Sequence, residues 1–175
     1  GHVHWCNGAG DARETILQIC NNVNAKTVGK GKSMVSEEIA LNDYLIANGL
    51  EVVETDLGEY ILQLREETPS HVVMPAIHLK KEQIADTFRD HHTTLDPDRP
   101  LDAPSDMTEE ARTKLREKFL SADVGITGAN MLIAETGSIV VVTNEGNGDL
   151  TQTLPRVHIV IAAIEKVVPR VDDAL

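Results

Sequence analysis

Three polar segments of this 175-residue sequence carry side chains whose types and spacing could do chemistry. The first is KGKSMVSEE, residues 30–38, where Lys30 and Lys32 precede Ser33 and Ser36 at the expected start of a helix. Ammonium groups, hydroxyls and the free N–H groups of a helix N-terminus all suit a phosphate or carboxylate. The segment therefore predicts an anion site, although its spacing is not that of a P-loop. The alternative is a serine that only caps the helix, with solvated lysines.

The second segment is ETDLGEY, residues 54–60, which places three carboxylates within six residues. Clustered carboxylates can hold a metal ion or raise one another's pKa values for acid–base chemistry. We expect Asp56 and Glu59 to belong to a ligand site, and we predict no metal ligands. The alternative is that Asp56 caps the next helix with Glu59 at its third position.

The third segment is AETGSIVVVTNEGNG, residues 134–148. Glu135 lies between an apolar run and a turn at Thr136 and Gly137, so we expect it at the edge of a buried layer. Burying a carboxylate is costly unless it is paired, which makes Glu135 the predicted catalytic residue. Amides and backbone donors after the following strand predict a ligand-binding loop, with hairpin turns as the alternative for its glycines. The loop residues of interest are Asn144, Glu145 and Asn147.

Histidines give a weaker signal, because no HExxH or two-His-one-carboxylate spacing occurs in the sequence. His78 follows Pro75 near the end of a strand expected at residues 72–74, and we keep it as a candidate ligand-binding residue. We interpret the other histidines as structural.

Apolar runs and helical periodicity alternate along most of the chain, which predicts an α/β domain with a mainly parallel sheet flanked by helices. Close spacing around Glu135 predicts an added antiparallel hairpin, and the apolar run at residues 138–143 predicts a strand covered on both faces. All three polar segments follow expected strands, and ligands of open α/β sheets bind at the carboxyl ends of strands. Helices are expected at residues 11–21, 36–48, 56–64, 80–90 and from 108 onward, with a surface loop at 91–107 and strands at 27–28, 50–53, 72–74, 124–127, 131–134 and from 157 onward.

Composition excludes several classes of partner. The formal net charge of −12 disfavours nucleic acid and anionic lipid. No apolar run is long enough to span a bilayer, and these residues contain no signal-peptide pattern. Cys6 and Cys20 lack CxxC spacing, which favours a reduced, cytoplasmic setting. The chain begins at Gly1 rather than at methionine, so we interpret residues 1–175 as one domain of a longer protein.

Long stretches of the sequence resemble the lactate-utilisation (LUD) domain family, in particular its iron–sulfur proteins. Together they cover nearly the whole chain. They are HVHW, KGKSMVSEE, EVVETDLGEYILQLREETPSHVVMPAIH, REKFLSADVGITGAN, AETGSIVVVTNEGNG and LPRVHIVIAAIEKVVP.

The resemblance implies a fold related to ribose-phosphate isomerases and CoA-transferases. It also implies a cytoplasmic three-component system that oxidises L-lactate to pyruvate, with the other subunits of that system as partners and a small anion (lactate, phosphate or a CoA-type molecule) as ligand. Iron–sulfur proteins of this kind carry two [4Fe–4S] clusters on a ferredoxin-like segment. The cysteines of that segment are absent from this chain, so we expect no cofactor within it.

Two other functions stay open. CoA-transferases use a glutamate near a glycine turn as nucleophile, so the chain could be a stand-alone CoA-transferase-like or sugar-phosphate-isomerase-like enzyme. Glu135 would then be the nucleophile or base, and Lys30 and Lys32 would hold the anion. Alternatively, the domain could be a scaffold that docks other subunits, with the polar segments serving only as caps and turns.

Overall fold

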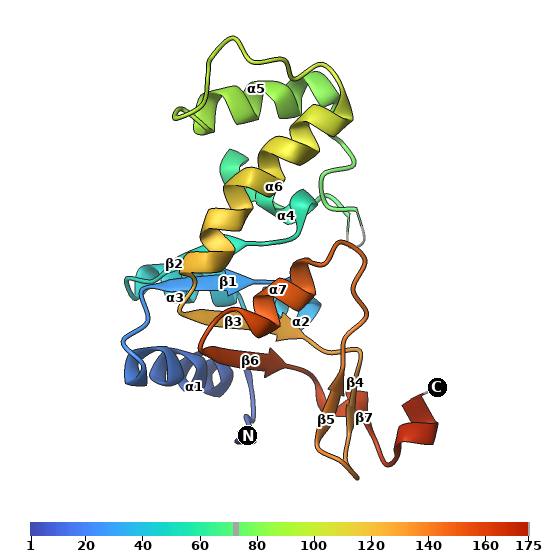
Figure 1. Ribbon diagram of the computed structural model, residues 1–175. Coiled ribbons are helices and arrows are strands. Elements are labelled where there is room, and N and C mark those ends of the chain that lie inside the picture. The colour runs from blue at the N-terminus through green and yellow to red at the C-terminus, as the bar shows by residue number, and fades with distance from the viewer. Residues whose placement is uncertain (72–73, 175) are drawn as a thin grey trace.

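The main sheet consists of four parallel strands in the order β2-β1-β3-β6 (Figure 1). The computed structural model describes residues 1–71 and 74–174. The sheet confirms the predicted α/β class with a mainly parallel sheet. From β1 the chain crosses first to β2 on one side and later to β3 on the other, so the strand order reverses between β1 and β3. The strands are β1 (Thr27–Lys30), β2 (Glu51–Glu54), β3 (Val124–Gly128) and β6 (Val157–Ile161).

One face of this sheet is covered by α1 (Ala9–Asn22) and α3 (Leu41–Ala47). The single helix expected at residues 36–48 is in fact two, because Ala40 adopts a left-handed conformation with φ 48° and ends α2 (Met34–Glu38). The break lets α2 lie beyond the strand ends while α3 packs on the sheet. The buried apolar side chains of this core are Ile16, Cys20, Val28, Leu41, Leu45, Leu50, Val52, Val124 and Ile126.

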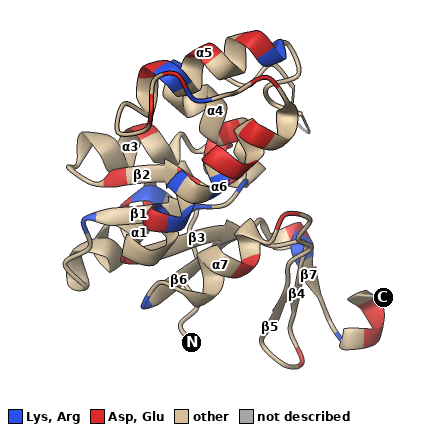
Figure 2. Cartoon of the chain, turned by 45° about the horizontal axis from the view of Figure 1, so that its top comes forward, with Lys and Arg blue, Asp and Glu red and all other residues tan. Residues whose placement is uncertain are grey.

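A second core forms where three further helices pack together on the opposite side of the molecule. Ala111, Leu115 and Phe119 are buried there, as their helical spacing predicts. Asp and Glu segments recur along the outer helices of this part (Figure 2). The helices of this core are α4 (Leu57–Arg65), α5 (Lys81–His91) and α6 (Pro104–Ser121). Helix α7 (Asn147–Thr153) packs instead on β3 and β6 of the main sheet.

Helix α6 begins at Pro104 rather than at residue 108, because the Asp106 carboxylate accepts a hydrogen bond from the Ala103 N–H and starts the helix early. Helix α7 begins at Asn147, within the loop predicted at residues 144–148. The strand expected at residues 72–74 falls mostly outside the described residues.

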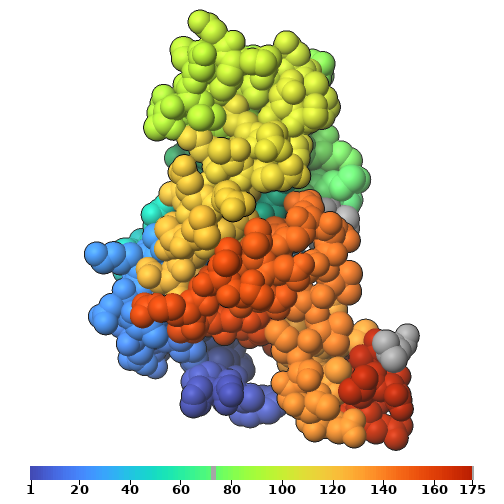
Figure 3. Space-filling view, viewed as in Figure 1, coloured from blue at the N-terminus to red at the C-terminus, as the bar shows by residue number. Residues whose placement is uncertain are grey.

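A small second sheet, in the order β5-β4-β7, projects beyond the main one (Figure 3). The antiparallel β4–β5 pair confirms the predicted hairpin. The strand expected to be covered on both faces is instead exposed: Ser138 and Ile139 face solvent because the hairpin lies beside the core, not within it. The elements are β4 (Met131–Ile133), β5 (Ser138–Val140), η1 (Ile164–Lys166), β7 (Val167–Val168) and η2 (Val171–Ala174).

Within residues 1–71 and 74–174, no helix combines the length and apolarity needed to cross a membrane.

Candidate functional site

A cavity of about 390 Å³ opens at the carboxyl ends of β1, β3 and β6. Its walls come from the loop after β1, the residue Asp56 after β2, the end of β3, the chain between β5 and α7, and the chain from the end of β6 to the end of η1. It therefore lies where the strand order reverses, the place where ligands bind in open α/β sheets. Its size falls in the range of small-molecule sites, roughly 300–1,000 Å³.

This pocket brings together residues from all three polar segments of the sequence. Asp56 caps α4, since its Oδ1 accepts hydrogen bonds from the N–H groups of Gly58 and Glu59. Ser33 likewise caps α2 by accepting from the Ser36 N–H. Capping and pocket lining are therefore not alternatives here, because the capping residues also face the cavity. The predicted residues that line it are Lys32, Ser33, Asp56, Asn144, Glu145 and Asn147.

Lys30 and Ser36, predicted to bind the anion, lie beneath the pocket instead. Lys30 Nζ is 2.9 Å from Glu54 Oε1 and donates to Ser36 Oγ at 3.2 Å. Only 1% of the Lys30 side chain is exposed, so its charge is already neutralised inside the protein. Lys30 is the last residue of β1, whereas Lys32 follows the strand end and reaches the cavity.

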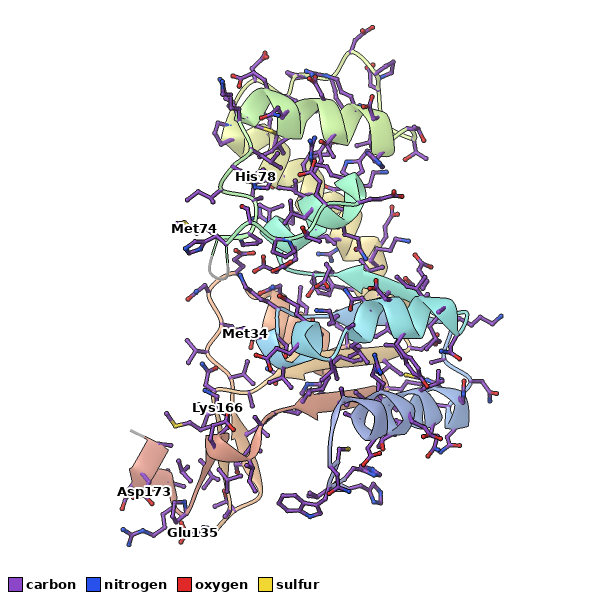
Figure 4. The ribbon with its side chains drawn as sticks, turned by 180° about the vertical axis from the view of Figure 1, so that it is seen from behind. Met34, Met74, His78, Glu135, Lys166 and Asp173 are labelled. Carbon is purple, nitrogen blue, oxygen red and sulfur yellow. The ribbon has the colours of Figure 1, made fainter. Side chains whose placement is uncertain are left out.

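Glu135, Thr136 and Gly137 form the exposed turn of the projecting hairpin, outside the pocket. Figure 4 shows Glu135 at the far end of the small sheet, away from Met34 and Lys166 of the pocket wall. The expectation that Glu135 borders a buried layer is wrong, for the same reason that β5 is exposed.

His78 also lies outside the pocket, before α5 (Figure 4). Its Nδ1 is 2.7 Å from Ser70 Oγ and its Nε2 is 3.0 Å from Glu67 Oε2. His78 thus links the chain before α5 to Glu67 and Ser70, which follow the C-terminal end of α4.

Several pocket residues carried no recognisable signal in the sequence. Lys166 reaches the cavity from η1 and adds a second cation opposite the β1 loop. Thr127, also in the wall, has its Oγ1 2.8 Å from His158 Nε2, and partial burial lowers the pKa of that histidine. These residues come from segments whose approach is set by tertiary packing, so spacing could not identify them. The remaining unpredicted polar residues are Asn130 and Thr143.

Lys32 lies near one buried carboxyl group, that of Glu59. Its Nζ lies 3.7 Å from Glu59 Oε1, and only 7% of the Glu59 side chain is exposed. Burial, with the nearby charges of Glu37 and Glu54, raises the pKa of Glu59 to about 7. These effects outweigh the attraction of Lys32 and Lys30, so Glu59 can exchange a proton near neutral pH.

Two further carboxyl groups, those of Glu145 and Asp56, lie directly in the pocket wall. Partial burial and the charge of Asp56 raise the pKa of Glu145. The pocket therefore combines cations that can hold an anionic group with carboxylates that can accept a hydrogen bond or a proton.

The residues of this chain do not fit an iron–sulfur cluster. A [4Fe–4S] cluster takes four thiolates, and the only cysteines are the exposed Cys6 and the buried Cys20. Burial also raises the pKa of the Cys20 thiol to about 11, which disfavours the thiolate that binds metal. In the described part of the chain, no cluster of three or more His, Cys, Asp or Glu side chains is arranged to hold a metal ion.

Replacing Glu59 with glutamine is expected to reduce the pH dependence of stability. The folded chain keeps the Glu59 proton up to a pKa of about 7, whereas the ordinary value is 4.5, so unfolding releases a proton between these values. The free energy of unfolding therefore falls as pH rises through this window. Glutamine at position 59 does not titrate, so the variant does not lose stability in this pH window. Its free energy of unfolding should exceed that of wild type by about 2 kcal/mol near pH 8.

Urea denaturation at a series of pH values measures this difference. Glu51→Gln serves as the control, because Glu51 is half exposed and pairs with Lys118 on the surface. Its curve should run parallel to that of wild type. Equal pH slopes for Glu59→Gln and wild type would contradict the prediction.

Comparison with known proteins gives a family and several relatives. The family model described as LUD domain matches residues 1–175. The uncharacterized electron transport protein YkgF of Escherichia coli is 49% identical over 169 residues, which cover 97% of this chain and 35% of that protein. Lactate utilization protein B of Bacillus subtilis is 49% identical over 174 residues, with 97% and 35% covered. The protein of the same name from Bacillus licheniformis is 47% identical, with 99% and 36% covered.

The chain thus spans about a third of the length of these relatives. No solved structure matches it.

Proposed function

We propose that this chain, which belongs to the LUD domain family, is the LUD domain of a cytoplasmic lactate utilisation protein and takes part in the oxidation of L-lactate to pyruvate. Relatives that are 47–49% identical over almost the whole chain carry the name lactate utilization protein B. This similarity is the observation that carries the proposal. Other subunits of a lactate-oxidising complex are the proposed partners.

Within this function, we assign to the pocket the binding of a small anion. Lactate carries a carboxylate and a neighbouring hydroxyl, so it needs a cation and a hydrogen-bond acceptor. Lys32 and Lys166 supply cations, and Asp56 and Glu145 supply acceptors, in the wall of one cavity. Phosphate and CoA-type molecules would use the same lysines. The alternative of a stand-alone enzyme built on Glu135 gains no support from the geometry, because Glu135 lies on an exposed turn outside this cavity.

Electron transfer is proposed for the whole protein rather than for residues 1–175. One relative is named an electron transport protein, and the chain spans only about a third of it. Any [4Fe–4S] clusters, which would carry single electrons, would be held by cysteines outside this chain. The pocket residues would bind and orient the substrate and move its protons.

Complementation of a deletion strain tests both the role in lactate oxidation and the role of the pocket in binding an anion. Deleting the gene of the whole protein should abolish growth on L-lactate, and the wild-type gene should restore it. Whole protein carrying Lys32→Gln should not restore growth, because the pocket loses one of its two cations, the one on the β1 loop. Lys26→Gln is the matched control, since Lys26 is exposed and precedes β1 at the opposite end of the sheet.

Growth of the deletion strain on L-lactate, in the absence of a second lactate-oxidising system, would overturn the lactate role. Growth restored equally by the two lysine variants would instead remove the pocket from the function while leaving the family role intact.

A further inference from the structure

We infer that the mouth of the pocket is a docking surface for the part of the whole protein that lies outside residues 1–175. The surface, which we call the apolar rim, consists of Met34, Val142 and Ile164. Its purpose, to bring that part of the protein close to a substrate in the pocket, rests on the proposed function. Its position rests on the exposed side chains themselves.

The rim consists of large apolar side chains that are left in solvent around one cavity. The exposed fractions are 54% for Met34, 68% for Val142 and 73% for Ile164. Met34 and Val142 line the cavity, and Ile164 lies in the chain between Ala163 and Lys166, which line it as well. Figure 4 shows Met34 and Lys166 on the same side of the molecule. Because the rim residues belong to α2, the chain after β5 and η1, tertiary packing gathers them at this place.

The rim differs in chemistry from the wall below it. The wall offers lysines, carboxyl groups and amides, which suit a small polar anion. Apolar side chains at the entrance add nothing to the binding of such an anion. They are also too open to enclose a small molecule, because a ligand site buries about 70–90% of its ligand's surface. Exposed apolar side chains gathered beside polar ones are typical of a surface that contacts another polypeptide.

An unpaired sheet edge adjoins the rim. Strand β5 (Ser138–Val140) ends two residues before Val142 and, in the described part of the chain, pairs only with β4. Its outer N–H and C=O groups are therefore open to a further strand, and Ile139 on it is 36% exposed. Proteins usually cover such an edge, and extended segments often add to it. The edge and the rim both indicate that a further polypeptide covers this end of the molecule.

The size of the surface favours the rest of the same polypeptide over a second copy of this chain. The residues matched here make up only 35% of the relatives' length, so about two thirds of such a protein lies outside them. A stable complex of separate proteins buries about 1,600 Å², more than three side chains and one short edge supply. A tethered segment needs less contact, because the linker holds it at an effective concentration on the order of mM.

Docking at this place would serve the proposed oxidation. Converting L-lactate to pyruvate removes two electrons and two protons from the substrate. The electrons would pass to the iron–sulfur clusters proposed for the docked part, and the protons to solvent by way of the pocket carboxylates. A polypeptide on the rim also shields the cavity from water, which strengthens the attraction between the pocket lysines and an anion.

Site-specific photo-cross-linking of the whole protein tests the inference. Benzoylphenylalanine placed at position 164 should form light-dependent links to peptides outside residues 1–175 of the same polypeptide. Position 120 is the matched control, because Leu120 is 66% exposed but lies on α6, outside the pocket. Links from position 164 to outside peptides should be at least tenfold more frequent than links from position 120.

The inference is overturned if position 164 forms no links, links only to peptides within residues 1–175, or links no more often than position 120. Links that join two molecules and double the mass would show that a second copy occupies the rim instead. Intramolecular links to the outside part in a protein that binds no L-lactate would support the docking and contradict the proposed function, so the two can fail separately.

A charge placed in the rim tests its role in the reaction. Whole protein carrying Ile164→Glu should bind L-lactate within twofold of wild type by calorimetry, because Ile164 does not line the cavity. The same variant should slow growth of the complemented deletion strain on L-lactate at least threefold. Leu120→Glu should change neither. An equal loss of L-lactate binding and growth in Ile164→Glu would mean that the rim is part of the ligand site and not a docking surface.

Discussion

Gly125→Ala is expected to lower the free energy of unfolding by about 3 kcal/mol or more. Helix α7 packs so closely on β3 that a Cβ at Gly125 would overlap the Thr151 carbonyl oxygen and lie 3.1 Å from Pro155 Cγ. The first neighbour is backbone, so no rotamer change relieves the clash. Moving α7 would also displace Asn147 and Gly148, which line the pocket, and anion binding should weaken together with stability.

Gly29→Ala is the matched control, because Gly29 pairs with Gly125 in the register between β1 and β3. A Cβ at Gly29 would meet Ala122 Cβ at 3.6 Å and Thr55 Cγ2 at 3.8 Å, both ordinary contacts. Its stability should stay close to that of wild type. Urea denaturation of the two variants measures the contrast, and equal stabilities would show that α7 does not need this close approach.

The α/β class and the pocket's main residues could be predicted from the sequence. Both depend on the order in which strands, helices and polar segments follow one another along the chain. Polar segments that directly follow strands of a parallel sheet meet at one edge, whatever the strand order. Lys32 after β1 and Asp56 after β2 follow this rule and do line the pocket. Glu145 also lines it, but it follows β5 of the small second sheet, so the rule does not account for its place. Lys166 could not be predicted, because its place in the wall depends on the pairing of β7, which directly follows η1, with β4 of the small sheet.

Burial was the property that sequence predicted least well. Glu135 follows an apolar strand, yet that strand belongs to a small projecting sheet, so its neighbours cannot bury it. The opposite error concerns Lys30, which was expected to bind an anion in the pocket but is buried. It has the same side chain as Lys32 and lies only two residues before it. Lys30 is still part of β1 and faces the α2–α3 side of the sheet, where Ser36 and Glu54 contact it. Whether a lysine is a ligand or an internal partner thus depends on where the strand ends, a boundary that sequence patterns place only within a few residues.

Lys30→Met is expected to lower the free energy of unfolding by about 3–5 kcal/mol. The methionine matches the apolar stem of Lys30 but leaves Glu54 as a buried carboxylate without its cation. Asn42 Nδ2 still donates to Glu54 Oε1 at 2.6 Å, which offsets only part of the loss. Because β1 leads directly into the loop that carries Lys32, local distortion should weaken anion binding as well.

A double-mutant cycle with Glu54→Leu isolates the interaction of the pair. Replacing both members removes both buried charges, so Lys30→Met/Glu54→Leu should be more stable than Lys30→Met alone, even though it carries one more substitution. Urea denaturation of the four proteins gives the coupling energy. Additive losses would mean that Lys30 and Glu54 stabilise the fold independently, and the charge of Lys30 would then be available to the pocket. A large coupling would instead mean that Lys30 is an internal partner of Glu54, and Lys32 would be the lysine of the β1 loop that the pocket presents to an anion.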